Sequence, residues 1–164
     1  MKACVLHNTA DVSTNPLAIA EVDKPEPTHD RVLIKVNVCG VCRTDLHVIE
    51  GELDQSKQKF PVIPGHQIIG TIDEIGERVT GFNVGDRVGV AWLHRTCGEC
   101  RYCQIGRENL CEHADFTGWT VDGGYAEYVT ADPQFVYAIP GELSDEHTAP
   151  LMCAGIIGYR CLRC

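Results

Sequence analysis

The stretch "RVLIKVNVC", residues 31–39, decides the fold that the sequence predicts. Every second side chain in it is β-branched and aliphatic: Val32, Ile34, Val36 and Val38. The side chains between them, Leu33, Lys35 and Asn37, point to the opposite face if the chain is extended. An alternation with a period of two is the pattern of a β-strand, so we expect a strand here.

Four further short stretches have strand-like character. They are "GTIDEIG" (70–76), "GDRVGVAWL" (85–93), "YAEYVT" (125–130) and "FVYAIP" (135–140). Gly and Pro, which number 16 and 8 in the chain, stand mostly between such runs and are typical turn residues. Many short strands with frequent turns predict a mainly β, barrel-like architecture in which helices are few and short.

The last stretch, "TAPLMCAGIIGYRCLRC" (148–164), differs from the rest of the chain. It is apolar with spacing compatible with a helix, and it stops at Cys164 without a capping residue or a turn. A helical run that stops in this way predicts that the chain is part of a longer protein.

Composition limits the classes of function. The 164 residues are enough for one domain with a substantial core, and the formal net charge of -9 argues against nucleic acid or an anionic membrane as a partner. No apolar run is long enough for a signal peptide or a transmembrane segment, so we expect a cytoplasmic protein. Thiols stay reduced in the cytoplasm, which favours metal ligands and buried thiols over disulfides for the ten cysteines.

Four cysteines lie within the stretch "TCGECRYCQIGRENLC" (96–111), in a C-x2-C-x2-C-x7-C pattern: Cys97, Cys100, Cys103 and Cys111. Short gaps between thiolates suit tetrahedral zinc bound by four sulfurs. A [4Fe–4S] cluster usually has a three-residue last gap followed by Pro, whereas here the gap is seven residues and Glu112 follows. Four reduced thiols without a metal would be open to oxidation. We interpret the set as a structural zinc site, which is closed and performs no chemistry.

Three more candidate ligands are far apart in the sequence. Cys42 follows the predicted strand and begins a short helical turn that we expect Gly51 to end, His66 follows the turn "PG", and Cys153 stands in "APLMCAG". Two thiolates and one imidazole would give zinc three protein ligands and leave a fourth position open. Each residue taken alone is equally well explained as a buried cysteine or a loop histidine, and spacing does not unite them.

The chain resembles the zinc-dependent medium-chain alcohol dehydrogenases. The resemblance rests on "GVCRTDLH" (40–47), on "PGH" with the glycine- and valine-rich run that follows it (64–88), on the four-cysteine stretch, on "DGGYAEY" (122–128) and on "APLMCAGIIGYRCLR" (149–163). These motifs occur in order over nearly the whole chain. The resemblance implies a GroES-like barrel as the catalytic domain.

The resemblance also implies two zinc ions per chain, one catalytic and one structural. It assigns the catalytic zinc to Cys42, His66 and Cys153, and the structural zinc to the four cysteines described above. Asp45 matches the carboxylate that orients the ligand histidine, which fixes the ring tautomer and raises the basicity of the ligand.

The activity implied is the NAD- or NADP-linked oxidation of primary or secondary alcohols to aldehydes or ketones, through a zinc-bound alkoxide and hydride transfer. The resemblance places the Thr44 hydroxyl next to the substrate oxygen and makes His47 the outer proton acceptor, reached through the cofactor ribose. Both residues would therefore contact the cofactor. Arg43 matches a position that contacts the cofactor pyrophosphate in some members.

Two positions bear on how this chain differs from its relatives. Gln67 stands where the family usually has Glu, so we expect a less electron-rich catalytic zinc and a more acidic zinc-bound water. Ile49 and Trp92 match positions that line the alcohol pocket, and Ile49 replaces a Trp found in some enzymes of small alcohols, which favours a roomier cleft.

The resemblance divides the chain into a GroES-like catalytic domain (1–150), with a structural-zinc lobe at about 95–113, and the start of a connecting helix (151–164). A glycine-rich dinucleotide-binding unit, the Rossmann domain of the family, is missing from the sequence, so we expect negligible turnover by this chain alone. The choice between NAD and NADP and the oligomeric state are not readable, although homo-oligomers are typical of the family. Two alternatives stay open: a polyol or amino-alcohol dehydrogenase, and a non-catalytic module stabilised by zinc.

Overall fold

The computed structural model describes residues 1–163, and the predicted strand at residues 31–39 lies in its largest sheet as β3 (Val32–Gly40). Cys164, the last residue of the stretch expected to be helical, lies outside the described residues. The sheet has five strands in the order β8-β3-β4-β5-β9, and all its neighbouring pairs are antiparallel. The bounds of the other four strands are Gln67–Ile75 (β4), Arg87–Val90 (β5), Tyr128–Ala131 (β8) and Val136–Ala138 (β9).

Two smaller two-stranded sheets complete the β structure. One pairs β1 (Lys2–Leu6) with β2 (Leu17–Glu21), and the other pairs β6 (Leu93–Arg95) with β7 (Asp115–Phe116). The helices are short, as expected: α1 (Arg43–Glu50), α2 (Arg101–Gln104), α3 (Asp145–Thr148) and α4 (Ala154–Arg163), with 3-10 turns η1 (Val12–Thr14), η2 (Glu108–Leu110), η3 (Pro133–Phe135) and η4 (Ala149–Met152). The prediction of a mainly β fold with few short helices is confirmed.

The alternation of side chains along β3 is interrupted once. The prediction that Val38 shares a face with Val32, Ile34 and Val36 is therefore wrong. Val32, Ile34 and Val36 face one hydrophobic cluster with residues of β4, β5 and β8, as the alternation predicts. The pairing of β3 with β4 shifts register between Val36 and Val38, and Val38 instead packs with Ile69 on the other face. An irregularity of this kind inserts a residue and reverses the faces of the side chains that follow.

Local signals explain the helix that follows β3. Cys42 caps the N-terminus of α1, and the Asp45 carboxylate accepts a hydrogen bond from the Cys42 backbone N–H, so the first turn is closed as in a capping box. Gly51 ends the helix with a φ of 75°, a left-handed conformation that glycine adopts without strain. The expected helical turn between these two residues is present.

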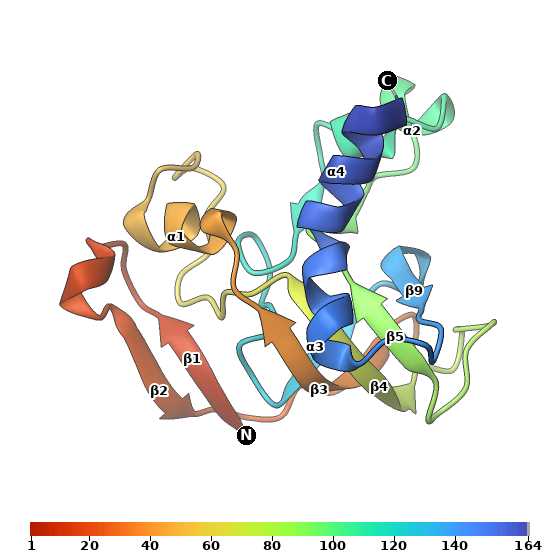
Figure 1. The fold of residues 1–164 in the computed structure, drawn as a ribbon, viewed down its shortest axis with the longest axis horizontal. Coiled ribbons are helices and arrows are strands. Elements are labelled where there is room, and N and C mark those ends of the chain that lie inside the picture. Colours follow the sequence, from red (N-terminus) through yellow and green to blue (C-terminus); the bar gives the residue numbers. More distant parts are fainter. Residues whose placement is uncertain (164) are drawn as a thin grey trace.

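The segment that carries α3 and η4 lies against the main sheet, and α4 follows it. Ala149 and Met152 of η4 are buried against Ile69 of β4, and α3 contacts β3 and β4. In Figure 1, α3 lies in front of these strands and α4 extends beyond the end of the sheet. Cys153 follows η4 directly, so the packing of η4 against the sheet determines the position of this cysteine. Within residues 1–163, the helices are all too short or too polar to cross a bilayer.

Candidate metal centres

The four cysteines of the C-x2-C-x2-C-x7-C pattern meet in one lobe built by α2, η2 and their loops. Their four Sγ atoms all lie within 4.8 Å of one another. The Sγ–Sγ distances are 3.5 Å between Cys100 and Cys103, 3.6 Å between Cys111 and Cys97, and 4.0 Å between Cys97 and Cys103. Thiolates about 2.3 Å from a tetrahedral zinc are about 3.8 Å apart, so the lobe has the size of a four-sulfur zinc site.

Backbone N–H groups help to hold a negative charge in this lobe. The Cys100 N–H points to the Cys97 Sγ and the Cys97 N–H points to the Cys111 Sγ, at 3.4 and 3.5 Å. Hydrogen bonds from the Cys103 backbone and side chain lower the pKa of Cys100 to about 6, whereas desolvation and the neighbouring Cys100 raise that of Cys103 to about 11. The lobe therefore favours at least one thiolate even before a metal enters, and thiolate is the form that binds zinc.

The second cluster unites three distant residues. Cys42 comes from the start of α1, His66 from the residue before β4, and Cys153 from the end of η4. Their candidate ligand atoms all lie within 4.8 Å of one another, and the Sγ atoms of Cys42 and Cys153 are 3.7 Å apart. That distance also matches the separation of about 3.8 Å expected for two thiolates on one tetrahedral zinc.

His66 is held so that one ring nitrogen remains available. The residue is completely buried, and its Nδ1 lies 3.0 Å from the Asp45 Oδ1. Its Nε2 is buried and has no hydrogen-bond partner among residues 1–163. A buried polar nitrogen without a partner is costly, and a metal ion between it and the two thiols would satisfy it.

Asp45 connects this histidine to a residue for which the sequence predicted no role. Asp45 is 2% exposed, and its Oδ2 accepts hydrogen bonds from the Cys42 N–H at 2.8 Å and from the Tyr125 hydroxyl at 2.9 Å. Burial and the charge of Asp45 raise the pKa of Tyr125, so its hydroxyl stays a donor. Tyr125 belongs to the "DGGYAEY" motif, but the motif alone did not show that it contacts Asp45.

Burial and neighbouring groups shift the pKa values of all three candidate ligands. Burial opposes charge on His66, but the hydrogen bond and charge of Asp45, together with Cys42, raise the pKa of His66. Burial also opposes the Cys42 thiolate, yet hydrogen bonds from Thr44 and Cys153 lower the pKa of Cys42. Burial and the neighbouring Cys42 raise that of Cys153 to about 11. The electrostatics thus suit a cation among the three side chains.

The expected relay residues lie on α1. Thr44 and His47 are one helical turn apart, and the Thr44 Oγ1 lies 3.8 Å from the Cys42 Sγ. The Nδ1 of His47 contacts the Glu52 carboxylate, just beyond the end of the helix, a partner that the sequence did not suggest. Arg43 is exposed at the first position of the helix. Its predicted contact with a cofactor stays a prediction.

An aromatic cluster stands beside His66. The ring centroid of Trp92 lies 5.0 Å from that of His66, in an edge-to-face arrangement. Trp119 and Phe116 stack on Trp92 at 5.9 and 5.2 Å, and neither was singled out from the sequence. Ile49 is 3% exposed and packs in one hydrophobic cluster with these rings, and its predicted place in the alcohol pocket stays a prediction.

Gln67 contacts one residue of the second cluster, Cys153. It is 4% exposed, and its side chain interacts with Cys153 in the sense that favours the thiolate. Gly40 leaves room for its amide, because a Cβ at that position would collide with the Gln67 Oε1. The Gln67 amide is therefore within reach of a candidate ligand, and its predicted effect on the zinc stays a prediction.

The sequence of this chain is similar to those of known alcohol dehydrogenases. The family model described as "Alcohol dehydrogenase GroES-like domain" matches residues 28–141. An alcohol dehydrogenase from Geobacillus stearothermophilus is 46% identical over 163 residues, which are 99% of this chain and 47% of the relative. The chain thus spans about half the length of the curated relatives it matches.

Two solved structures show the same architecture. A thermostable alcohol dehydrogenase from Pyrobaculum aerophilum, solved with cobalt and zinc bound, is 33% identical with a TM-score of 0.75, over 84% of this chain and 40% of that one. The protein CAD from Helicobacter pylori, solved in complex with NADP(H), is 28% identical with a TM-score of 0.83, over 99% of this chain and 49% of that one.

Proposed function

Because the chain belongs to the alcohol dehydrogenase GroES-like domain family, we propose that it is the metal-binding catalytic part of a zinc-dependent alcohol dehydrogenase. The whole enzyme would oxidise primary or secondary alcohols to aldehydes or ketones, with NAD or NADP as the hydride acceptor. The observation that carries this proposal is the buried Nε2 of His66, which has no hydrogen-bond partner among residues 1–163 and lies beside two thiols whose sulfurs are 3.7 Å apart. Three protein ligands leave a position for a substrate oxygen, which a closed four-sulfur site does not.

Zinc would be held by Cys42, His66 and Cys153, and when bound it would act as a Lewis acid that lowers the pKa of a hydroxyl group. The structural zinc would be held by the four cysteines of the lobe. Asp45 would keep the His66 Nδ1 protonated and its Nε2 free, because the carboxylate accepts the hydrogen bond of the Nδ1–H. The Tyr125 hydroxyl and the Cys42 N–H hold this carboxylate in place from its other oxygen.

We assign the release of the substrate proton to two residues of α1, Thr44 and His47. The Thr44 hydroxyl lies next to the Cys42 sulfur and would accept the proton nearest the site. His47, one turn along the same helix and part-exposed, would pass it to solvent. The contact of its Nδ1 with the Glu52 carboxylate would hold the ring in place.

The aromatic cluster of Trp92, Trp119 and Phe116 would form an apolar wall next to His66. Such a wall excludes water from the reacting atoms and strengthens the electrostatic interactions among them. It would also favour an alcohol with an apolar body.

Metal analysis tests the proposal directly. We expect two zinc ions per chain in the parent protein, and one in Cys42→Ser, because that change removes a ligand of the open site only. Cys4→Ser, a change at a cysteine outside both clusters, serves as the matched control and should keep two. One zinc per chain in the parent, unaffected by Cys42→Ser, would instead favour a non-catalytic module stabilised by the closed site.

A further inference from the structure

The position of Cys153 depends on a segment that is not a strand of the sheet. Residues 140–152 consist of a loop, α3 and η4, and they bring Cys153 to within 3.7 Å of Cys42. Cys42 and His66, by contrast, lie within two residues of the ends of long strands of the sheet. The geometry of the open site therefore depends on what holds this segment to the sheet.

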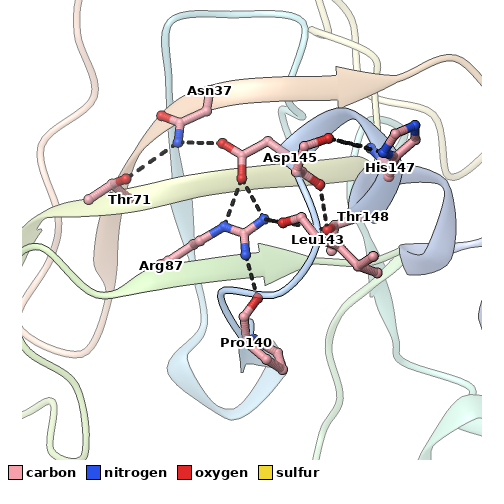
Figure 2. A network of polar contacts seen from close by, with 9 residues as sticks. Asn37, Thr71, Arg87, Pro140, Leu143, Asp145, His147 and Thr148 are labelled. Carbon is pink, nitrogen blue, oxygen red and sulfur yellow. Dashed lines mark hydrogen bonds and ion pairs between the residues drawn. The ribbon is translucent and has the colours of Figure 1, made fainter.

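Arg87 of β5 bonds to this segment at several points (Figure 2). Its guanidinium donates through Nη1 to the carbonyl oxygen of Pro140 and through Nη2 to that of Leu143, the latter at 2.8 Å. The Nε donates to the Asp145 Oδ1 at 2.7 Å, and Nη2 lies 3.4 Å from the Thr148 hydroxyl. One side chain thus binds the loop before α3 and both ends of α3.

Asp145 extends these contacts to β3. Its second oxygen, Oδ2, accepts a hydrogen bond of 2.8 Å from the Asn37 side-chain amide, which also reaches toward Thr71 of β4 (Figure 2). Side-chain exposures of 24% for Arg87 and 22% for Asp145 place the ion pair in a partly desolvated position. Charge-assisted hydrogen bonds in such a position are stronger and geometrically more specific than those of a fully exposed pair.

The 3-10 turn η4 packs against the face of β5 that carries Arg87. Gly89 is two residues from Arg87, and residues two apart in a strand face the same side. A Cβ on Gly89 would lie 2.8 Å from the Met152 Sδ, so the missing side chain makes room for the residue that precedes Cys153. Ala149 and Met152 are both buried at this point. The hydrogen bonds of Arg87 thus hold the segment before η4, and the close packing at Gly89 holds the end of η4.

We propose that Arg87 is a positioning residue for the open metal site, acting through the 140–152 segment on Cys153. This inference rests on the proposed function, since it assumes that Cys153 is a ligand. Without the guanidinium, the carbonyl groups of Pro140 and Leu143 and the Asp145 carboxylate lose their shared partner, and Cys153 samples positions away from Cys42. The four-cysteine lobe belongs to another part of the chain and keeps its own geometry.

The test compares zinc affinity at the two sites of one molecule. The open and closed sites of the parent and of Arg87→Ala are titrated against a chromophoric zinc chelator, and the absorption spectra of the cobalt-substituted proteins are recorded. We expect the zinc affinity of the open site to fall about tenfold, as for other residues that orient metal ligands, while the closed site is unchanged. Arg87→Lys should recover part of the loss, because one ammonium group keeps the charge but does not bridge all three acceptors.

Two further variants exclude a merely structural effect. Arg31→Ala removes a comparable half-buried ion pair, with Asp132, outside the 140–152 segment, and it should change neither site. If Arg87→Ala does not fold, Asp145→Asn takes its place in the test, because it removes the carboxylate that pairs with Arg87 and keeps the volume of the side chain.

The outcomes separate this inference from the proposed function. A parent with two zinc ions and an Arg87→Ala variant with unchanged open-site affinity would overturn the role of Arg87 alone. A parallel loss at both sites would also overturn it, since it would indicate general destabilisation. A parent with a single zinc ion would overturn the open site and the inference together.

Discussion

Replacement of Asp45 by Asn should weaken the open metal site strongly, because three groups of the site depend on this carboxylate. Its Oδ1 faces the His66 Nδ1 at 3.0 Å, and its Oδ2 accepts from the Cys42 N–H and the Tyr125 hydroxyl. An asparagine has one carbonyl oxygen, so either His66 or the other two donors lose their acceptor. Asp45 is 2% exposed, and a buried donor without a partner costs about 1–3 kcal/mol.

That cost should appear as lost zinc affinity at the open site. Removal of the group that orients a histidine ligand typically weakens metal binding about 10- to 100-fold, which is about 1.4–2.8 kcal/mol and agrees with the cost of the broken hydrogen bond. Tyr125→Phe removes only one of the three hydrogen bonds, so we expect a loss of less than about tenfold.

The assay is a competition titration of both sites with a chromophoric chelator at fixed pH. Asp132→Asn is the matched control, because the Asp132 carboxylate also bonds to the first turn of a helical segment and is only 16% exposed, but it lies outside both cysteine clusters. If Asp45→Asn binds zinc at the open site as tightly as the parent does, the assignment of Asp45 as the residue that orients His66 is refuted.

Three further predictions concern the fold and the lobe. Ile34→Ala, at a fully buried position of β3, should lower the free energy of unfolding in urea by about 2–5 kcal/mol, whereas Ile19→Ala, at an 83% exposed position, should change it by less than about 0.5 kcal/mol. Burial, together with the charge of Arg31, lowers the pKa of His94 from 6.5 to about 4, so the unfolded state binds more protons between these values. The free energy of unfolding should therefore fall by about 3 kcal/mol as the pH drops from 6.5 to 4. Urea titrations at several pH values should show that His94→Gln removes most of this dependence. The same pH dependence in the variant and the parent would contradict the prediction. Chelation of zinc should open residues 97–111 to trypsin in a time course, and equal cleavage rates with and without chelator would show that the metal does not hold the lobe.

The local features of the fold could be predicted from the sequence because their causes are local. The alternation at Val32 and Ile34 predicts β3, and the glycine at position 51 predicts the end of α1. The four cysteines of the lobe lie within 15 residues, so their short gaps alone predict that they meet. The shift at Val38 was not predictable, because a bulge depends on the register of a partner strand and leaves no trace in the period of the strand itself.

The open site could not be assembled from local signals. His66 and Cys153 are far apart along the chain, and only the resemblance to a known family united them with Cys42. Contacts that depend on tertiary packing were missed for the same reason. The hydrogen bond from Tyr125 to Asp45 spans 80 residues, and the bond from Arg87 to Asp145 spans 58. Neither pair has a spacing that indicates contact, so both required the folded structure.

The anomalous X-ray diffraction of zinc-loaded crystals of this chain tests the central claim most directly. We predict two zinc peaks: one among the four cysteines of the lobe, and one about 2.3 Å from the sulfurs of Cys42 and Cys153 and about 2.0–2.1 Å from the Nε2 of His66. A single peak in the lobe, with none among Cys42, His66 and Cys153 at saturating zinc, would contradict the account of an open metal site.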